Sequence, residues 1–178
     1  MTIYYLDSSA LVKRYLNETG SAWVASLFAT TPDNEVFIAA ITSVEVTAAI
    51  TWRARGGSIE STDAAAACQT LRADLATDYQ IVELSEPLLT SAATVAETHA
   101  LRGYDAVQLA AALAVNRLCV GNALPPITFV SADDELKMIA ATQGMVVENP
   151  PSSSLTGNAA IAAMQARRCY SAGGTECS

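Results

Sequence analysis

The chain has 178 residues, of which 51% are apolar and 16% charged, and its formal net charge is −8. This length and apolar content suit one compact domain with a sizeable buried core. The acidic balance excludes the broadly basic surface that holds nucleic acid nonspecifically, so nucleic acid would need bound metal and a few local cations, and a basic partner could dock on the acidic surface instead.

Strand-like apolar runs alternate with segments of helical periodicity along the chain. In chain order we predict a strand at 2–6, helices at 8–16 and 21–29, a strand at 36–41, helices at 43–55 and 61–76, a strand at 79–82, helices at 87–100 and 104–118, a strand at 127–130, a helix at 133–142 and a strand at 145–147. Strands separated by helices pair in parallel through right-handed crossovers. The predicted fold is therefore α/β, with a central, mainly parallel sheet of four to five strands and helices on both faces.

The chain divides at a Pro/Ser-rich stretch, 150–154, that follows the last predicted strand. We predict a single domain at 1–148, followed by a linker and C-terminal tail at 149–178. One short helix, 158–168, is expected in that tail. The last ten residues should be poorly ordered, because they are rich in Ser and Gly.

Neither a membrane segment nor an export signal is expected. The longest apolar runs, such as 106–115, fall short of the ~20 residues needed to cross a bilayer. The N-terminus lacks the basic start, long apolar stretch and small-residue cleavage site of a signal peptide. The four cysteines show no C-x-x-C spacing, which argues against a zinc site or a dense disulfide framework. We expect a cytoplasmic protein with reduced thiols.

Four carboxylates follow the ends of predicted strands or lie at helix starts. Asp7 comes directly after the first strand, Glu45 lies one turn into the helix after the second, Asp105 begins the central apolar helix, and Asp133 follows the strand 127–130. Open α/β sheets bind ligands at the carboxyl ends of their strands. Oxygen-only carboxylate clusters are typical of Mg²⁺ and Mn²⁺ sites, which hydrolyse phosphodiesters without a Ser or His nucleophile.

Helix capping is the alternative explanation for each of these acids. Asp7 and Asp105 could each cap the helix that they precede, residues 42–45 fit the capping-box pattern that ends at Glu45, and Asp133 with Asp134 offers two more capping acids. Capping needs no shared location, whereas a metal site needs carboxylates from different segments to meet. Without a cation, such a cluster would raise its own pKa values by mutual repulsion.

Other hydrolytic chemistries lack their residues. His99 is the only histidine, so a Ser-His-Asp triad has no other base. A second acid at position 9, required for an Asp-x-Asp nucleophile, is replaced by Ser9. Gly56 and Gly57 are not followed by the Lys-Ser/Thr of a phosphate-binding loop.

Four segments resemble the PIN-domain ribonucleases, and most closely the VapC-type toxins of bacterial toxin–antitoxin pairs. The segments are YYLDSSALVK (4–13), SVEV (43–46), YDAVQLA (104–110) and FVSADDEL (129–136). They occur in family order, and the resemblance spans about residues 1–147. The resemblance implies a metal-dependent endoribonuclease that hydrolyses RNA phosphodiester bonds.

The resemblance also implies a set of site residues. Asp7 and Asp105 would contact one or two Mg²⁺ or Mn²⁺ ions directly. Glu45 would be a ligand or orient the attacking water, and Asp133 would serve a second ion or a water-mediated contact. Asp134 is a substitute or outer ligand. Ser8 and Ser131 would support the carboxylates, although each could equally be a cap or turn serine.

Partners follow from the same resemblance. It implies a small antitoxin whose tail occupies the acidic groove, and a homodimer. Residues that could line a groove for substrate or partner are Lys13, Arg14, Trp52, Arg53 and Arg55. Trp52 could instead belong to the core, and the two later arginines could be a solvated helix end. The alternative functions are a non-catalytic PIN-fold binding module and an RNA-processing or decay nuclease without an antitoxin.

Overall fold

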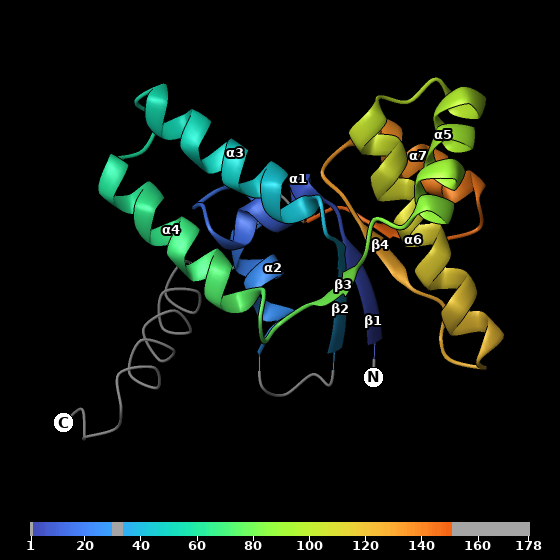
Figure 1. Cartoon of the computed structure of the whole chain (residues 1–178). Coiled ribbons are helices and arrows are strands. Elements are labelled where there is room, and N and C mark those ends of the chain that lie inside the picture. The colour runs from blue at the N-terminus through green and yellow to red at the C-terminus, as the bar shows by residue number, and fades with distance from the viewer. Residues whose placement is uncertain (1, 30–33, 151–178) are drawn as a thin grey trace.

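Five parallel strands form the centre of the molecule (Figure 1). The computed structural model describes residues 2–29 and 34–150. The strand order is β3-β2-β1-β4-β5, and every neighbouring pair is parallel. The strands are β1 (Thr2–Leu6), β2 (Asn34–Ala39), β3 (Gln80–Val82), β4 (Thr128–Val130) and β5 (Val146–Glu148).

The direction of winding changes between β1 and β4. The chain steps outward from β1 to β2 and β3, and then returns to the other side of β1 to form β4 and β5. Leu6 is aligned with Val130 at the carboxyl ends of these two central strands, and the Asp7 amide donates to the Val130 carbonyl at 3.1 Å. Such a switch point is where open α/β sheets form their ligand crevice. Asp7 lies at that point.

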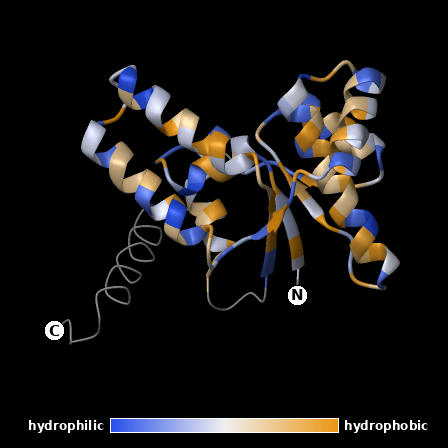
Figure 2. Cartoon of the chain, viewed as in Figure 1, coloured by the Kyte–Doolittle hydropathy of each residue, from blue (hydrophilic) through white to orange (hydrophobic). Residues whose placement is uncertain are grey.

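Helices cover both faces of the sheet, as Figure 1 shows. The helices are α1 (Ser8–Leu11), the 3₁₀ turn η1 (Val12–Arg14), α2 (Ser21–Ser26), α3 (Thr42–Arg55), α4 (Ser61–Asp74), α5 (Glu86–His99), α6 (Gly103–Gly121) and α7 (Asp134–Thr142). One core cluster joins the sheet to α5, α6 and α7, and the other joins it to the helices from α1 to α4. In Figure 2 the hydrophobic colours accordingly gather on the strands and on α6.

The first core cluster depends on the alanine-rich middle of α6. Ala110, Ala111 and Ala112 are fully buried there, beside the stacked rings of Tyr5 and Phe129. Because alanine side chains are short, a helix lined with them can lie close to its neighbours while leaving few voids. This packing fixes α6 against α5 and the sheet, and so fixes the position of the α6 N-terminus at the upper edge in Figure 1.

The α/β class and the parallel sheet agree with the prediction, and most element bounds agree within about two residues. The predicted helix at 8–16 is wrong in its second half, because α1 ends at Leu11 and continues as the tighter η1 turn. In that turn the Tyr15 amide donates to the Val12 carbonyl, and both Tyr15 and Leu16 become buried. The predicted tail helix at 158–168 lies outside the described residues.

Among residues 2–29 and 34–150, no helix combines the length and the apolar character needed to span a membrane. Cys68 and Cys119 are buried free thiols in the same ranges. The other two cysteines lie outside the described residues.

Candidate active site

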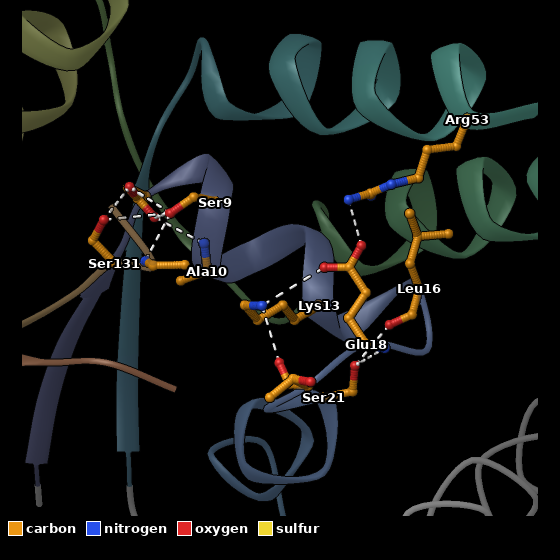
Figure 3. Close-up of polar contacts among 11 residues, drawn as sticks. Ser9, Ala10, Lys13, Leu16, Glu18, Ser21, Arg53 and Ser131 are labelled. Atoms are coloured by element: carbon orange, nitrogen blue, oxygen red, sulfur yellow. Dashed lines mark hydrogen bonds and ion pairs between the residues drawn. The ribbon is translucent and has the colours of Figure 1, made fainter. Parts of the chain in front are cut away.

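Asp7 is the buried centre of a hydrogen-bond cluster at the switch point. Its carboxylate is only 3% exposed and accepts from the Ser9 hydroxyl at 2.7 and 2.9 Å, the Ser131 hydroxyl at 2.7 Å and the Ala10 amide at 2.8 Å. Ser9 also accepts from the Ala132 amide, so it joins the start of α1 to the loop after β4. Figure 3 shows Ser9 and Ser131 pointing toward each other across these two segments.

Glu45 reaches the same edge of the sheet from the first turn of α3. Its Oε2 accepts from the Gln108 side-chain amide at 2.6 Å. Gln108 is only 1% exposed, and its amide also contacts the hydroxyls of Tyr5 and Thr42 at 2.9 Å each. A buried polar layer therefore lies beneath Glu45 and joins β1, α3 and α6.

Asp105 and Asp133 come from the first turn of α6 and the start of α7. Asp133 is the N-cap of α7, and its Oδ1 accepts from the Leu136 amide at 2.9 Å. Its own amide donates to the Ser131 hydroxyl at 3.0 Å, which ties it to the Asp7 cluster. Asp105 lies inside the first turn of α6, after the N-cap residue Arg102.

The four carboxylates repel one another across this edge. Burial raises the pKa of Asp7 to about 6, hydrogen bonds from Ser131, Ser9 and Ala10 lower it, and the charge of Glu45 raises it further. Burial, and then the charge of Asp105, raise the pKa of Glu45, whereas hydrogen bonds from Gln108 and Ser8 lower it.

Asp105 continues the series. Burial raises its pKa, the charge of Asp133 raises it further, and the charge of Arg102 lowers it. Along the order Asp7, Glu45, Asp105 and Asp133, the charge of each following acid thus raises the pKa of the acid before it. Acids separated by up to 126 positions in the sequence therefore lie along one end of the sheet.

The carboxylate oxygens of the site are the ligand type that a hard divalent cation prefers. The carboxylates approach one another in pairs and do not form a single group of three or four. Within the described ranges, no three His, Cys, Asp or Glu side chains are grouped tightly enough to hold a metal ion. Each oxygen of Asp7 already accepts two hydrogen-bond contacts, one from the bifurcated Ser9 hydroxyl and one from Ala10 or Ser131, so a cation would replace part of this set. Oxygen ligands that repel one another are what Mg²⁺ and Mn²⁺ would stabilise.

Capping explains two of the four acids. Asp7 caps α1 through the Ala10 amide, and Asp133 caps α7. The predicted capping box at Glu45 is wrong, because the N-cap of α3 is Ile41, which makes no side-chain cap bond. The alternative for Asp105 is also wrong, because Arg102 precedes its helix as N-cap. Glu45 and Asp105 therefore lie at this edge for a reason other than capping.

The accessory residues differ in how they meet the cluster. Ser131 bonds Asp7, and Ser8 bonds Glu45. Asp134 faces solvent, with its side chain 93% exposed, and pairs with Lys137 at 2.8 Å, which lowers its pKa.

Sequence reasoning missed Ser9 and Gln108 as parts of the cluster. A serine two residues after a strand-end aspartate, and a single amide in the apolar stretch 106–115, were the available signals.

Two of the predicted groove cations are tied to one carboxylate. Lys13 Nζ lies 3.6 Å from Glu18 and donates to the Thr19 carbonyl at 3.0 Å, and Arg53 pairs with the same Glu18 (Figure 3). Two cations share one anion here, so one positive charge remains at the junction of η1 and α3. Arg53 Nη1 is buried and, within the described part of the chain, has no hydrogen-bond partner.

Arg14 does not line a groove, so this prediction is wrong. Its side chain is 8% exposed and pairs with Asp74 at 2.9 Å and with Asp78. The guanidinium carbon lies 3.7 Å from the ring centroid of Phe28, and one nitrogen donates to the Tyr79 hydroxyl at 2.7 Å. Arg14 is thus a buried link between η1 and the segment around α4 and β3.

Trp52 is on the surface of α3, so the alternative that places it in the core is wrong. It is 66% exposed, and Val44 and Ala48, two turns and one turn earlier, are exposed on the same face. Arg55 is exposed at the end of the helix. This apolar face, defined by Val44, Ala48 and Trp52, begins beside Glu45.

Both the sequence and the fold are similar to those of known proteins. The sequence model of the PIN domain family matches residues 4–141. The chain is 35% identical over 115 residues to "Ribonuclease VapC45" of Mycobacterium tuberculosis (strain CDC 1551 / Oshkosh), a match that covers 65% of this chain and 78% of that protein. Residues 4–141, which the family model matches, include all four acids.

Two solved structures share the architecture. The structure of VapBC2 from Rickettsia felis bound to a DNA fragment from their promoter has a TM-score of 0.55 at 16% identity, covering 83% of this chain and 98% of that chain. FitAcB from Neisseria gonorrhoeae has a TM-score of 0.55 at 18% identity, covering 84% and 98% respectively. At these identities the likeness is one of fold.

Proposed function

The chain belongs to the PIN domain family, and we propose that it is a metal-dependent endoribonuclease and the toxin of a type II toxin–antitoxin pair. One observation carries the proposal. Four acids from four separate helix starts lie along the switch-point edge of the sheet. The charge of Glu45 raises the pKa of Asp7, that of Asp105 raises the pKa of Glu45, and that of Asp133 raises the pKa of Asp105, and Glu45 and Asp105 cap no helix. A protein gains no stability from such repulsion, and a bound cation would relieve it, which supports the proposal.

In this proposal Asp7, Glu45, Asp105 and Asp133 hold one or two Mg²⁺ or Mn²⁺ ions. When bound, the metal activates a water molecule and stabilises negative charge on the phosphate. Ser9, Ser131 and the Ala10 amide fix both oxygens of Asp7, so its orientation does not depend on the ligand. Burial removes competing water from that carboxylate.

The test is cleavage of a pool of random-sequence RNA oligonucleotides. We expect the protein to cleave the pool with Mn²⁺ or Mg²⁺, but not with a chelator, and we expect Asp7→Asn to abolish cleavage. Asp63→Asn removes an exposed carboxylate from α4 and is the matched control, which should keep full activity. Equal cleavage by the wild type and Asp7→Asn would reject the catalytic proposal.

The partner proposal rests on the naming of the relatives as VapC ribonucleases and of structural neighbours as VapBC and FitAB assemblies. A small antitoxin would cover the exposed face of α3 that begins beside Glu45, and the Lys13–Glu18–Arg53 cluster would lie on the route of RNA or of the antitoxin tail. Homodimerisation belongs to the same proposal.

Expression in a bacterial host tests the toxin role. The wild type should arrest growth, and Asp7→Asn should not. Co-expression with the product of an adjacent small reading frame should relieve the arrest. If the wild type cleaves RNA in vitro but leaves growth unchanged, the protein is an RNA-processing nuclease instead.

A further inference from the structure

Gln108 is a buried amide in the most apolar helix of the molecule. It is 1% exposed and lies between Val107 and Leu109 in the second turn of α6. Burying an amide costs free energy unless its hydrogen bonds are satisfied. Here both the oxygen and the nitrogen of the amide are hydrogen-bonded. The partner from β1 is Tyr5, 103 positions away along the chain, and the partners from α3 are Thr42 and Glu45, 66 and 63 positions away.

The partners fix which way the amide points. Tyr5 keeps its phenolic proton at neutral pH and donates it to Oε1 at 2.9 Å. Nε2 then faces Thr42 at 2.9 Å and Glu45 at 2.6 Å. The reverse orientation would set a carbonyl oxygen against the Glu45 carboxylate, so the observed one is favoured. Tyr5 therefore orients Gln108, and Gln108 holds Glu45.

We propose that Gln108 is a positioning residue that holds the Glu45 carboxylate at the metal site, an inference that rests on the proposed function. Glu45 is half-buried, projects from a helix and could adopt several rotamers, and the bond from Gln108 selects one of them. Residues that orient metal ligands in this way commonly change metal affinity by about 10–100-fold when they are replaced.

A purely structural role is the competing explanation. Replacing Gln108 alone leaves the buried Tyr5 hydroxyl without its acceptor and so lowers stability under either explanation, because a buried donor that loses its partner carries a desolvation cost. Metal affinity therefore separates the two explanations. If Gln108 is purely structural, replacing it changes only the melting temperature. If it positions Glu45, replacing it also weakens the affinity for the metal.

The principal variant is Gln108→Met, which keeps the length of the side chain and removes the donor. We expect its dissociation constant for Mn²⁺, measured by isothermal titration calorimetry, to rise about 10–100-fold. The matched control is Asn116→Leu, which removes another α6 amide, one that accepts from the Ile127 amide at 3.1 Å at the far end of the helix. The control should keep the wild-type affinity even if its melting temperature falls.

A double-mutant cycle with Glu45→Gln shows whether Gln108 acts through Glu45. Once Glu45 has lost its charge, Gln108→Met should weaken Mn²⁺ binding by less than about twofold more. Raising the Mn²⁺ concentration should also restore RNA cleavage by Gln108→Met. Should Gln108→Met not fold, Gln108→Asn keeps a buried amide that is one methylene shorter, and it should show the same loss of affinity.

The outcomes separate this inference from the proposed function. If the wild type binds no Mn²⁺ at millimolar concentration, the proposed function fails and the inference fails with it. If the wild type binds Mn²⁺ and Gln108→Met binds it equally well, only the positioning role is overturned. Equal further losses of affinity in the wild-type and Glu45→Gln backgrounds would overturn it as well.

Discussion

Replacing Asp7 by Asn should stabilise the metal-free protein above neutral pH while abolishing its activity. Burial raises the pKa of Asp7 to about 6 from the ordinary value of 3.8, so the folded state binds this proton more tightly than the unfolded state does. The contribution of Asp7 to stability is therefore fully present below pH 3.8 and is lost as the pH rises through about 6. Above that pH the buried charge opposes folding.

The magnitude follows from the same two values. A pKa difference of about two units corresponds to about 3 kcal/mol of unfolding free energy. This is an upper bound for Asp7→Asn, because the amide can accept from Ala10 but cannot accept from both Ser9 and Ser131. For a domain of this size, each kilocalorie corresponds to roughly 2–4 °C in melting temperature.

The assay is a thermal melt in the presence of a chelator at pH 8 and pH 5. Asp7→Asn should melt several degrees above the wild type at pH 8, and about half of that gain should disappear at pH 5. Asp63→Asn, the exposed control, should melt with the wild type at both pH values. If Asp7→Asn is less stable than the wild type at pH 8, its hydrogen bonds outweigh its desolvation and the reasoning is refuted. Added Mn²⁺ should raise the melting temperature of the wild type and of Asp63→Asn, but not that of Asp7→Asn.

Two further predictions concern residues that the structure separates from the site. Arg14→Met should lower the unfolding free energy by about 3–5 kcal/mol in urea titrations, because it removes the buried guanidinium from its ion pairs with Asp74 and Asp78. A loss below about 1 kcal/mol would show that these ion pairs contribute no more than surface ones do. Asp134→Ala should keep RNA cleavage within about twofold of the wild type, because its exposed carboxylate pairs with Lys137. A hundredfold loss would instead identify Asp134 as a metal ligand.

The strand ends were predictable from sequence because they depend on local patterns. Apolar runs mark β1 and β4, and the next polar residues are Asp7 and Ser131 with Asp133. Parallel strands have their carboxyl ends at one edge, so the meeting of these residues follows from the α/β class alone. The position of β4 beside β1 was not predicted, since local patterns do not specify strand order.

The polar layer beneath the site could not be predicted, because its bonds depend on the directions of side chains far apart in sequence. Gln108 meets Glu45 across 63 positions, and Ser131 meets Asp7 across 124. Arg14 shows the same limit. Its sequence neighbourhood suits a surface cation, and only the approach of Asp74 and Asp78 from the end of α4 makes it a buried one.

Capping and metal binding are compatible at Asp7, although the sequence presents them as alternatives. Burial alone would favour the neutral acid, which has little affinity for a cation. The Ala10 amide at the start of α1, together with the two serine hydroxyls, lowers the pKa to about 6, so the carboxylate is ionised by about ten to one at pH 7. The bond that caps the helix therefore helps to preserve the charge that a cation needs. Glu45 lacks a cap bond, and its pKa is lowered instead by hydrogen bonds from Gln108 and Ser8, so Asp7 and Glu45 rely on different local donors to favour the charged form.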